Sequence, residues 1–400
     1  MKKTILLLCV ILALLLAGCG KTTQRDDTDP GQGPQSVDTT DVVYADVVTP
    51  KTFELRVPPE DRNQAFYCTS FVETPEVYYY GQNRQGKVFI YFCPRGGDTF
   101  RPLCSKPNCK HNDQNCNAYA GNAYAYYDGS IYAAEYKSDT IDILKLNLDG
   151  TDHRRLTTLE LDASMRNHFT FQFHRGKLII WNCLSDLEKT DHILVLDLSD
   201  NSLKDYPQTD KIILIEKFYE NKLYGVVMER DAGADASDTK KLVEFDLVTG
   251  EVRSLAEKNI ASLYATASTL YYFEPDMSAL PGYEASEAAE PGFRELDLKT
   301  GTTRDCGMPV EDILSACYDD DFIYADSFRR NNGRDETMYI LSRDYVLLDQ
   351  IDLEGISIAA VTSDRIYLYD AMTASTINYY IDKAQIGSGA LTLVPIETVG

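Results

Sequence analysis

A short apolar step recurs seven times along this 400-residue chain, each time just after a polar turn. It is an aliphatic residue followed by tyrosine or a second aliphatic residue, and successive copies lie 54, 47, 45, 47, 53 and 43 residues apart. This repeat constrains the fold more than any other feature, because it fixes the size of the structural unit. The copies are Val77-Tyr78, Ile131-Tyr132, Leu178-Ile179, Leu223-Tyr224, Leu270-Tyr271, Ile323-Tyr324 and Ile366-Tyr367.

Most copies are followed by a second signature, an alternating strand that ends in a tight turn. Glycine or asparagine in such a turn accepts a positive φ, and aspartate hydrogen-bonds to nearby backbone, so two strands fold back on each other. A further strand precedes several copies, as at 123–127, so each unit is predicted to hold four antiparallel strands. The turn sequences are KLNLDG from residue 145, LDLSDN from 196, FDLVTG from 245 and LDLKTG from 296.

These units predict an all-β chain that forms a β-propeller of four-stranded antiparallel blades. Seven copies indicate seven blades, with six and eight as alternatives, in a single domain that spans 42–400. The chain holds 27 tyrosines and 15 phenylalanines, and its per-blade tyrosines are expected to pack between blades rather than form a ligand platform. Residues 52–57 are expected either to pair with the last blade and close the ring or to lie against it.

The N-terminal residues carry a targeting pattern. Lys2 and Lys3 precede an apolar run over 5–16, which ends in Leu16-Ala17-Gly18-Cys19. This order resembles the signal peptide (1–18) and lipobox of exported bacterial lipoproteins. The run is also shorter than the about 20 apolar residues that a membrane span needs. The resemblance implies that Cys19 is acylated and anchors the protein to the cell membrane on its extracytoplasmic face, and residues 19–41 are predicted to be a disordered tether.

Two segments carry further resemblances. The stretch GSIYAAEYKSDTIDILKLNLDGTDHRRLTTL, residues 129–159, is similar to the YWTD-like propeller repeats of the low-density-lipoprotein-receptor-related type. The stretch PLCSKPNCKHNDQNCNAY, residues 102–119, is similar to a segment of Gram-positive bacterial lipoproteins of a domain-of-unknown-function class. Both imply a propeller lipoprotein. No copy contains a literal Tyr-Trp-Thr-Asp, so the ligands of the receptor family do not carry over to this chain.

One group of residues has the spacing of a metal site. Cys104, Cys109, His111 and Cys116 follow the pattern C-x4-C-x-H-x4-C and place four soft or borderline donors within one loop. Zinc accepts a Cys3His set, whereas exported proteins tend to oxidise neighbouring thiols, so a zinc site on one side, and disulfide-bonded or free structural cysteines on the other, both remain open here. Cys68 with Cys93, and Cys306 with Cys317, are further candidate pairs.

Charge excludes some partners and suggests a binding face. The formal net charge of -23 argues against binding to nucleic acid or anionic lipid. Loops between the second and third strands of each blade emerge on the same face as the loops between blades. They vary most in blades four to six, so this face is the candidate binding surface for a protein, peptide or glycan. Its charged candidates are Arg329, Arg330, Arg334, Glu284, Glu287 and Glu290, whereas Asp319-Asp320-Asp321 is expected to be a solvated turn on the opposite face.

Two functions are compatible with this sequence. It lacks H-E-x-x-H, G-x-S-x-G, Walker A and G-x-G-x-x-G motifs, and no catalytic residues are assigned. His168 and His174 bracket one predicted strand and are expected to be ordinary half-buried histidines. The favoured function is a membrane-anchored binding or scaffold module, and the alternative is a propeller hydrolase or lyase with its site at the mouth of the central channel.

Overall fold

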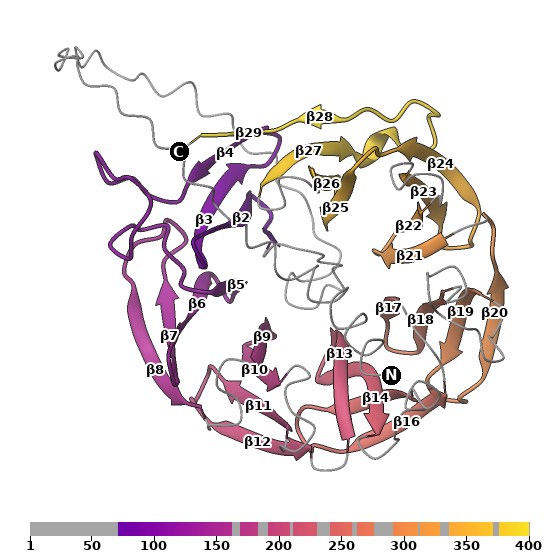
Figure 1. Ribbon diagram of the computed structural model, residues 1–400, viewed down its shortest axis with the longest axis horizontal. Helices are drawn as coiled ribbons and strands as arrows, with labels where there is room; N and C mark the ends of the chain where they lie inside the picture. The colour runs from indigo at the N-terminus through magenta and orange to yellow at the C-terminus, as the bar shows by residue number, and fades with distance from the viewer. Residues whose placement is uncertain are drawn as a thin grey trace, which may run out of the picture.

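In the computed structural model, each of the seven sequence copies forms one four-stranded antiparallel sheet, and the sheets stand in a ring (Figure 1). The chain is a seven-bladed β-propeller. The structure describes residues 71–161, 169–182, 191–208, 211–229, 241–257, 262–275, 291–310, 313–328, 336–370 and 376–399. The prediction of an all-β fold with seven blades is therefore confirmed, and six and eight blades are excluded. Cys19, the tether and residues 52–57 lie outside the described residues.

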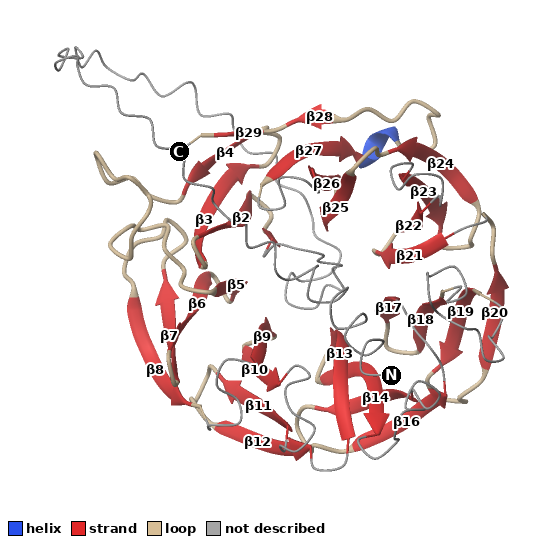
Figure 2. Ribbon diagram, viewed as in Figure 1, coloured by secondary structure: helices blue, strands red, loops and turns tan. Residues whose placement is uncertain are grey.

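Strands follow one another from the centre of the ring to its rim (Figures 1 and 2). Blades one and two consist of β1 (Phe71–Glu73), β2 (Val77–Arg84), β3 (Lys87–Pro94), β4 (Thr99–Pro102), then β5 (Ala123–Tyr127), β6 (Ser130–Lys137), β7 (Thr140–Leu146), β8 (Arg154–Glu160). Blades three and four consist of β9 (Phe169–His174), β10 (Lys177–Asn182), β11 (Asp191–Asp197), β12 (Leu203–Gln208), then β13 (Lys211–Tyr219), β14 (Lys222–Glu229), β15 (Lys241–Asp246), β16 (Val252–Glu257).

The remaining blades repeat the same order. Blades five and six consist of β17 (Ser262–Ala265), β18 (Thr269–Glu274), β19 (Gly292–Asp297), β20 (Thr303–Gly307), then β21 (Ile313–Tyr318), β22 (Phe322–Phe328), β23 (Glu336–Ser342), β24 (Leu347–Asp352). Blade seven consists of β25 (Ile356–Val361), β26 (Arg365–Asp370), β27 (Ile377–Asp382) and β28 (Val394–Pro395), with the 3-10 helix η4 (Lys383–Gln385) before β28. Among the described residues no helix is long and apolar enough to span a membrane.

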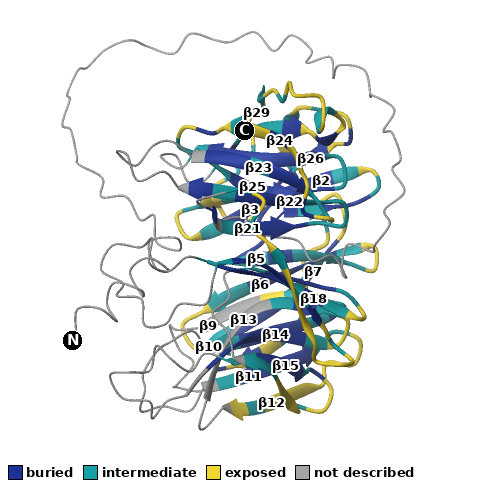
Figure 3. Ribbon diagram, turned by 90° about the vertical axis from the view of Figure 1, so that its right-hand side faces the viewer, coloured by how far each residue is buried: buried dark blue, intermediate teal, exposed yellow. Residues whose placement is uncertain are grey.

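The repeated apolar step lies in the second strand of every blade. Its residues pack in apolar clusters shared with neighbouring blades, and much of these strands is buried (Figure 3). Tyrosines at this step are buried in five of the six blades that carry one, and Tyr271 is half-buried. Buried aromatic rings supply large contact area between stacked sheets. The prediction that these tyrosines are core is thus confirmed for Tyr78, Tyr132, Tyr224, Tyr324 and Tyr367.

The second signature forms the turn between the third and fourth strands, and an aspartate closes it. Asp246 Oδ1 accepts hydrogen bonds from the backbone N–H of Val248 and Thr249 at 2.7 and 2.9 Å, and Asp297 does the same for Lys299 and Thr300. Each turn rests on the preceding blade. The Tyr206 hydroxyl of blade three, for example, donates to Val248 O of blade four at 3.0 Å.

The ring is closed by the C-terminus. After β28 the chain crosses to blade one, where β29 (Glu397–Thr398) adds a fifth strand that runs parallel to β4 (Figure 1). At the same junction of blades seven and one, Arg95 is fully buried and pairs with the buried carboxylate of Glu73. Its Nη1 lies 3.1 Å from Asp364 of blade seven, so one guanidinium links the first blade to the last.

The acidic turn Asp319-Asp320-Asp321 is not simply solvated, which corrects the expectation from sequence. Asp319 Oδ2 accepts hydrogen bonds from the Tyr324 hydroxyl at 2.7 Å and from Lys383 Nζ of blade seven at 2.6 Å. Asp320 accepts one from the Tyr264 hydroxyl of blade five at 2.6 Å. These carboxylates join neighbouring blades, because buried tyrosine hydroxyls need acceptors.

Candidate metal centre

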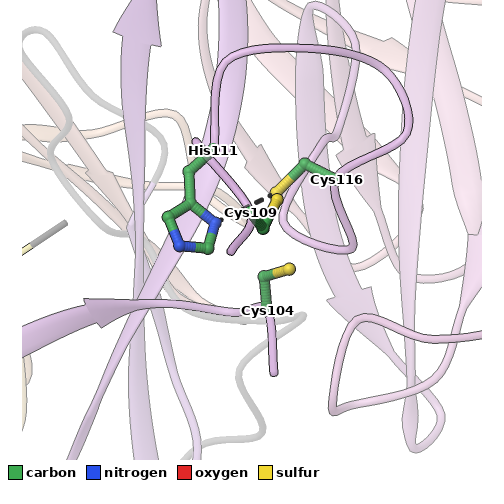
Figure 4. A group of neighbouring side chains, drawn as sticks. All are labelled: Cys104, Cys109, His111 and Cys116. Carbon is green, nitrogen blue, oxygen red and sulfur yellow. Dashed lines mark hydrogen bonds between the residues drawn. The ribbon is translucent and has the colours of Figure 1, made fainter. Parts of the chain in front are cut away.

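Cys104, Cys109, His111 and Cys116 meet in the loop that leads from β4 to β5 (Figure 4). One ligand atom from each residue, three Sγ atoms and an imidazole nitrogen, lies within 4.8 Å of all the others. Cys116 is buried and the other three are half-buried. The loop lies beside the turn between β2 and β3, because Asn122 Nδ2 donates to Gly86 O at 3.2 Å. This confirms that the loop is on the face of the second-to-third-strand loops.

Local backbone geometry folds the loop around the cluster. Asn108 and His111 both have positive φ, 61° and 49°, which bends the chain back twice within four residues. Asp113 Oδ1 accepts a hydrogen bond from Asn115 N at 2.8 Å, and Cys116 N donates to Asp113 O at 3.1 Å. Asparagine and aspartate favour such turns, so the local sequence brings the last cysteine back to the first.

The thiols differ in acidity. Partial burial acts to raise the pKa of Cys104, but hydrogen bonds from backbone N–H groups and from the other thiols outweigh it and lower that pKa. Burial raises the pKa of Cys116 to about 12. Burial, with the Arg84 cation nearby, lowers the pKa of His111 and favours the neutral imidazole that binds metals. A bound divalent metal would favour the thiolate at each cysteine.

The donor set fits a single tetrahedral ion. Zinc bonds of about 2.3 Å to sulfur and about 2.0 Å to nitrogen place neighbouring donors about 3.5 to 3.8 Å apart in a tetrahedral Cys3His site. His111 Nδ1 already lies 3.4 Å from Cys116 Sγ. Four protein donors complete this coordination shell, which is typical of structural rather than catalytic zinc sites.

No disulfide joins the cysteines that the structure describes. Cys93, Cys104, Cys109, Cys116, Cys306 and Cys317 are all free thiols. The candidate pair of Cys306 and Cys317 is therefore not formed. Cys317 packs with Tyr324 and Met338, whereas Cys306 packs in a different apolar cluster between blades five and six. Cys68 lies outside the described residues.

Residues outside the donor set hold the ligands, and the sequence did not single them out. Arg84, at the end of β2, donates from Nη1 to His111 O at 3.3 Å and from Nη2 to the Tyr91 hydroxyl. Cys116 Sγ accepts a hydrogen bond from Ala118 N at 3.3 Å. Such outer contacts orient metal ligands in proteins. Arg84 lies 20 residues before the first cysteine, so only the pairing of β2 with β3 brings it to the cluster.

The remaining predicted site residues are not gathered at this centre. Arg329, Arg330, Arg334, Glu284, Glu287 and Glu290 lie outside the described residues, as does His168. His174 is buried against Phe218, and its Nε2 lies 2.7 Å from Glu220 O. Burial lowers its pKa to about 4, as expected for a packed neutral histidine.

Comparisons with known proteins concern the fold. No protein-family model matches the chain, and no curated protein is significantly similar to it in sequence. A prolyl endopeptidase structure matches with a TM-score of 0.52 and 10% identity, over 84% of this chain and 50% of that one. An acylaminoacyl peptidase bound to a chloromethyl ketone matches with a TM-score of 0.52 and 10% identity, over 82% and 52%. The β-propeller domain of the Trilobed protease from Pyrococcus furiosus has a TM-score of 0.49 and 10% identity, over 82% and 96%. This chain spans about half the length of the first two peptidases, and at such identity the likeness is one of fold alone.

Proposed function

We propose that this protein is a lipid-anchored, extracytoplasmic β-propeller that acts as a binding or scaffold module and carries one structural zinc ion. The observation that carries the zinc ion is the four-donor cluster in the loop after β4. Its donors fill the coordination shell of one ion and leave no position for a substrate, so the ion orders the loop instead of performing chemistry.

Zinc fits this donor set better than other biological metals. Three thiolates and an imidazole are the soft and borderline ligands that zinc takes in closed structural sites, while calcium and magnesium take oxygen ligands. The compact arrangement suits one ion rather than an iron–sulfur cluster, whose ligands are spread over more than one metal atom.

The anchor and the binding role rest on sequence. Leu16-Ala17-Gly18-Cys19, with its charged and apolar lead, supports acylation of Cys19 and attachment to the cell membrane. The resemblances at 102–119 and 129–159 point to the same class of propeller lipoproteins. The loops that vary most in sequence, which are expected on one face of the ring, support recognition of a protein, peptide or glycan, and the acidic charge argues against nucleic acid.

The alternative is a propeller hydrolase or lyase with its site at the channel mouth. Structures of a prolyl endopeptidase and an acylaminoacyl peptidase resemble this chain in fold, which is why the alternative stands. The sequence contains none of the hydrolase motifs searched for above, so the binding role is the better supported of the two.

The metal is tested on the 20–400 fragment, purified without added reductant or chelator. We expect one zinc per chain by elemental analysis, and three thiols that react with a thiol reagent only after a strong chelator is added. A chain free of metal, whose mass shows disulfides among Cys104, Cys109 and Cys116, contradicts the zinc assignment.

The anchor and binding face are tested separately. Cys19→Ala should abolish incorporation of labelled fatty acid, and unchanged labelling contradicts the anchor. Charge reversal at Arg329 and Arg330 should weaken capture of a cell-surface partner, and less so at high salt, where the Debye length is below about 8 Å. Lys299→Glu is the matched control, because Lys299 is exposed on the opposite face.

A further inference from the structure

The outer edge of β3 is paired by two separate segments of chain. Residues 99–103 cover its second half, where Tyr91 pairs with Pro102 and Leu103 N donates to Ile90 O at 2.8 Å. Residues 118–121 cover its first half, where Ile90 N donates to Ala118 O at 2.7 Å and Ala120 N donates to Val88 O at 2.9 Å. Both segments run antiparallel to β3 and meet at Ile90. Together they form one outer strand from which residues 104–117 loop out.

The four metal ligands sit around the neck of this loop. Cys104 directly follows the first half of the strand, and Cys116 is two residues before the second half begins. Cys116 Sγ also accepts the N–H of Ala118, the residue whose carbonyl pairs with Ile90. The exposed residues, such as Lys106 and Asn112, belong to the loop itself, while Leu103 and Ala118 at its base are buried.

The same neck is the contact between blades one and two. Gly150, in the turn between β7 and β8, lies so close that a Cβ atom there would be 2.5 Å from Leu103 O and 2.6 Å from Asn117 O. His153 Nε2 lies 3.1 Å from Asn117 O, and Asn122 N donates to Ala134 O at 2.8 Å. Blade two therefore contacts the chain at both halves of the strand.

The geometry points to what we call a splice. In it, the metal joins the two halves of blade one's outer strand and thereby holds in place the surface against which blade two packs. This inference rests on the proposed metal site and adds what the metal does there. Without a cross-link, the pairing of residues 118–121 with β3 must bring the two ends of the loop together, which costs conformational entropy. A metal bound at the neck already holds these ends together, so most of that cost is avoided. The other blades, whose fourth strands are continuous, do not depend on the metal.

The test is hydrogen exchange on the zinc-loaded 20–400 fragment before and after chelation. Amides of Val88, Ile90 and Ala120 should exchange roughly tenfold faster or more without metal, because local opening exposes them. Amides in blade six, such as that of Ile340, should keep their rates. Cys109→Ser should reproduce the change, and Lys110→Ser should not, since Lys110 is an exposed neighbour that offers no ligand.

The outcomes separate the splice from the metal site itself. If the fragment binds zinc but the three amides keep their protection after chelation, the splice is wrong while the metal site stands. If protection follows reduction of a disulfide instead of removal of metal, both are overturned. If chelation speeds exchange equally in every blade, the metal stabilises the whole ring, and the local splice is again wrong.

Discussion

Blade one has a junction on each side, and the two are built from different chemistry. Its junction with blade seven joins residues far apart in sequence, such as Arg95 and Asp364, through a buried ionic network and the added strand β29. Its junction with blade two is continuous along the chain but interrupted by the loop 104–117, which holds the Cys/His cluster. The first must offset the entropy of closing the entire ring, whereas the second has to fix one local loop. The closure of the ring uses many contacts, whereas the proposed metal would close the local loop with one cross-link.

The largest expected effect is at the ring closure. Arg95→Met should destabilise the protein by about 4 kcal/mol, because it leaves the fully buried Glu73 carboxylate without its counter-ion. Chemical denaturation of the variant measures this. Arg95→Met combined with Glu73→Gln should recover part of the loss, and a double variant as unstable as the single one would show that the charge pair is not the cause.

Removal of the metal should have the next largest effect. A ligand present at about 100 times its Kd stabilises the folded state by about 2.7 kcal/mol, and chelation should remove a contribution of that order. Thermal unfolding of the zinc-loaded and chelated protein measures it. The comparison of junctions predicts that Arg95→Met and chelation are additive, since the two networks share no residue. Strong coupling between them would mean that blade one responds as a single unit.

A smaller effect is expected where blade two meets the loop neck. Gly150→Ala should cost about 2 kcal/mol, because φ is +76° and the new methyl group would meet Leu103 O and Asn117 O. Gly301→Ala is the matched control, since its φ is +71° but no atom lies within 4 Å of the added carbon, and it should cost about 1 kcal/mol. Equal losses from urea unfolding would indicate that only the backbone conformation matters at Gly150.

The smallest expected effect is the pH dependence of stability that arises from His174, away from both junctions of blade one. His174 lies in blade three, and its pKa is lowered to about 4 from a usual value near 6.5. The unfolded chain therefore binds its proton first, so stability falls as pH drops from about 6.5 towards 4. Between pH 7 and 5 we expect a loss of about 1.8 kcal/mol, which His174→Phe should reduce. An unchanged pH response in this variant would assign the acid sensitivity to other groups, such as the metal ligands.

Sequence and structure each supplied part of the site. The spacing of Cys104, Cys109, His111 and Cys116 identified the donors, because donors close in sequence can meet through turns alone. Arg84 and Ile90 carried no such signal, since each acts through the pairing of strands. The short apolar run Ala118-Tyr119-Ala120 was a usable hint of a strand, but nothing in it named β3 as the partner. The turn at Asp319 was misjudged for the same reason, since its partners Lys383 and Tyr264 belong to other blades.

The sequence by itself determined the all-β fold and indicated seven blades, because every blade is a meander of neighbouring strands and its pattern of apolar steps and turns is local. Only the tertiary structure decided how blade one is completed on both sides. Three features join segments that meet only because the folded ring brings them together. They are the parallel pairing of β29 with β4, the Arg95 network and the pairing of residues 118–121 with β3. A local sequence pattern does not identify which distant segment a strand or a charged side chain will pair with. These partners are therefore decided only when the blades stack.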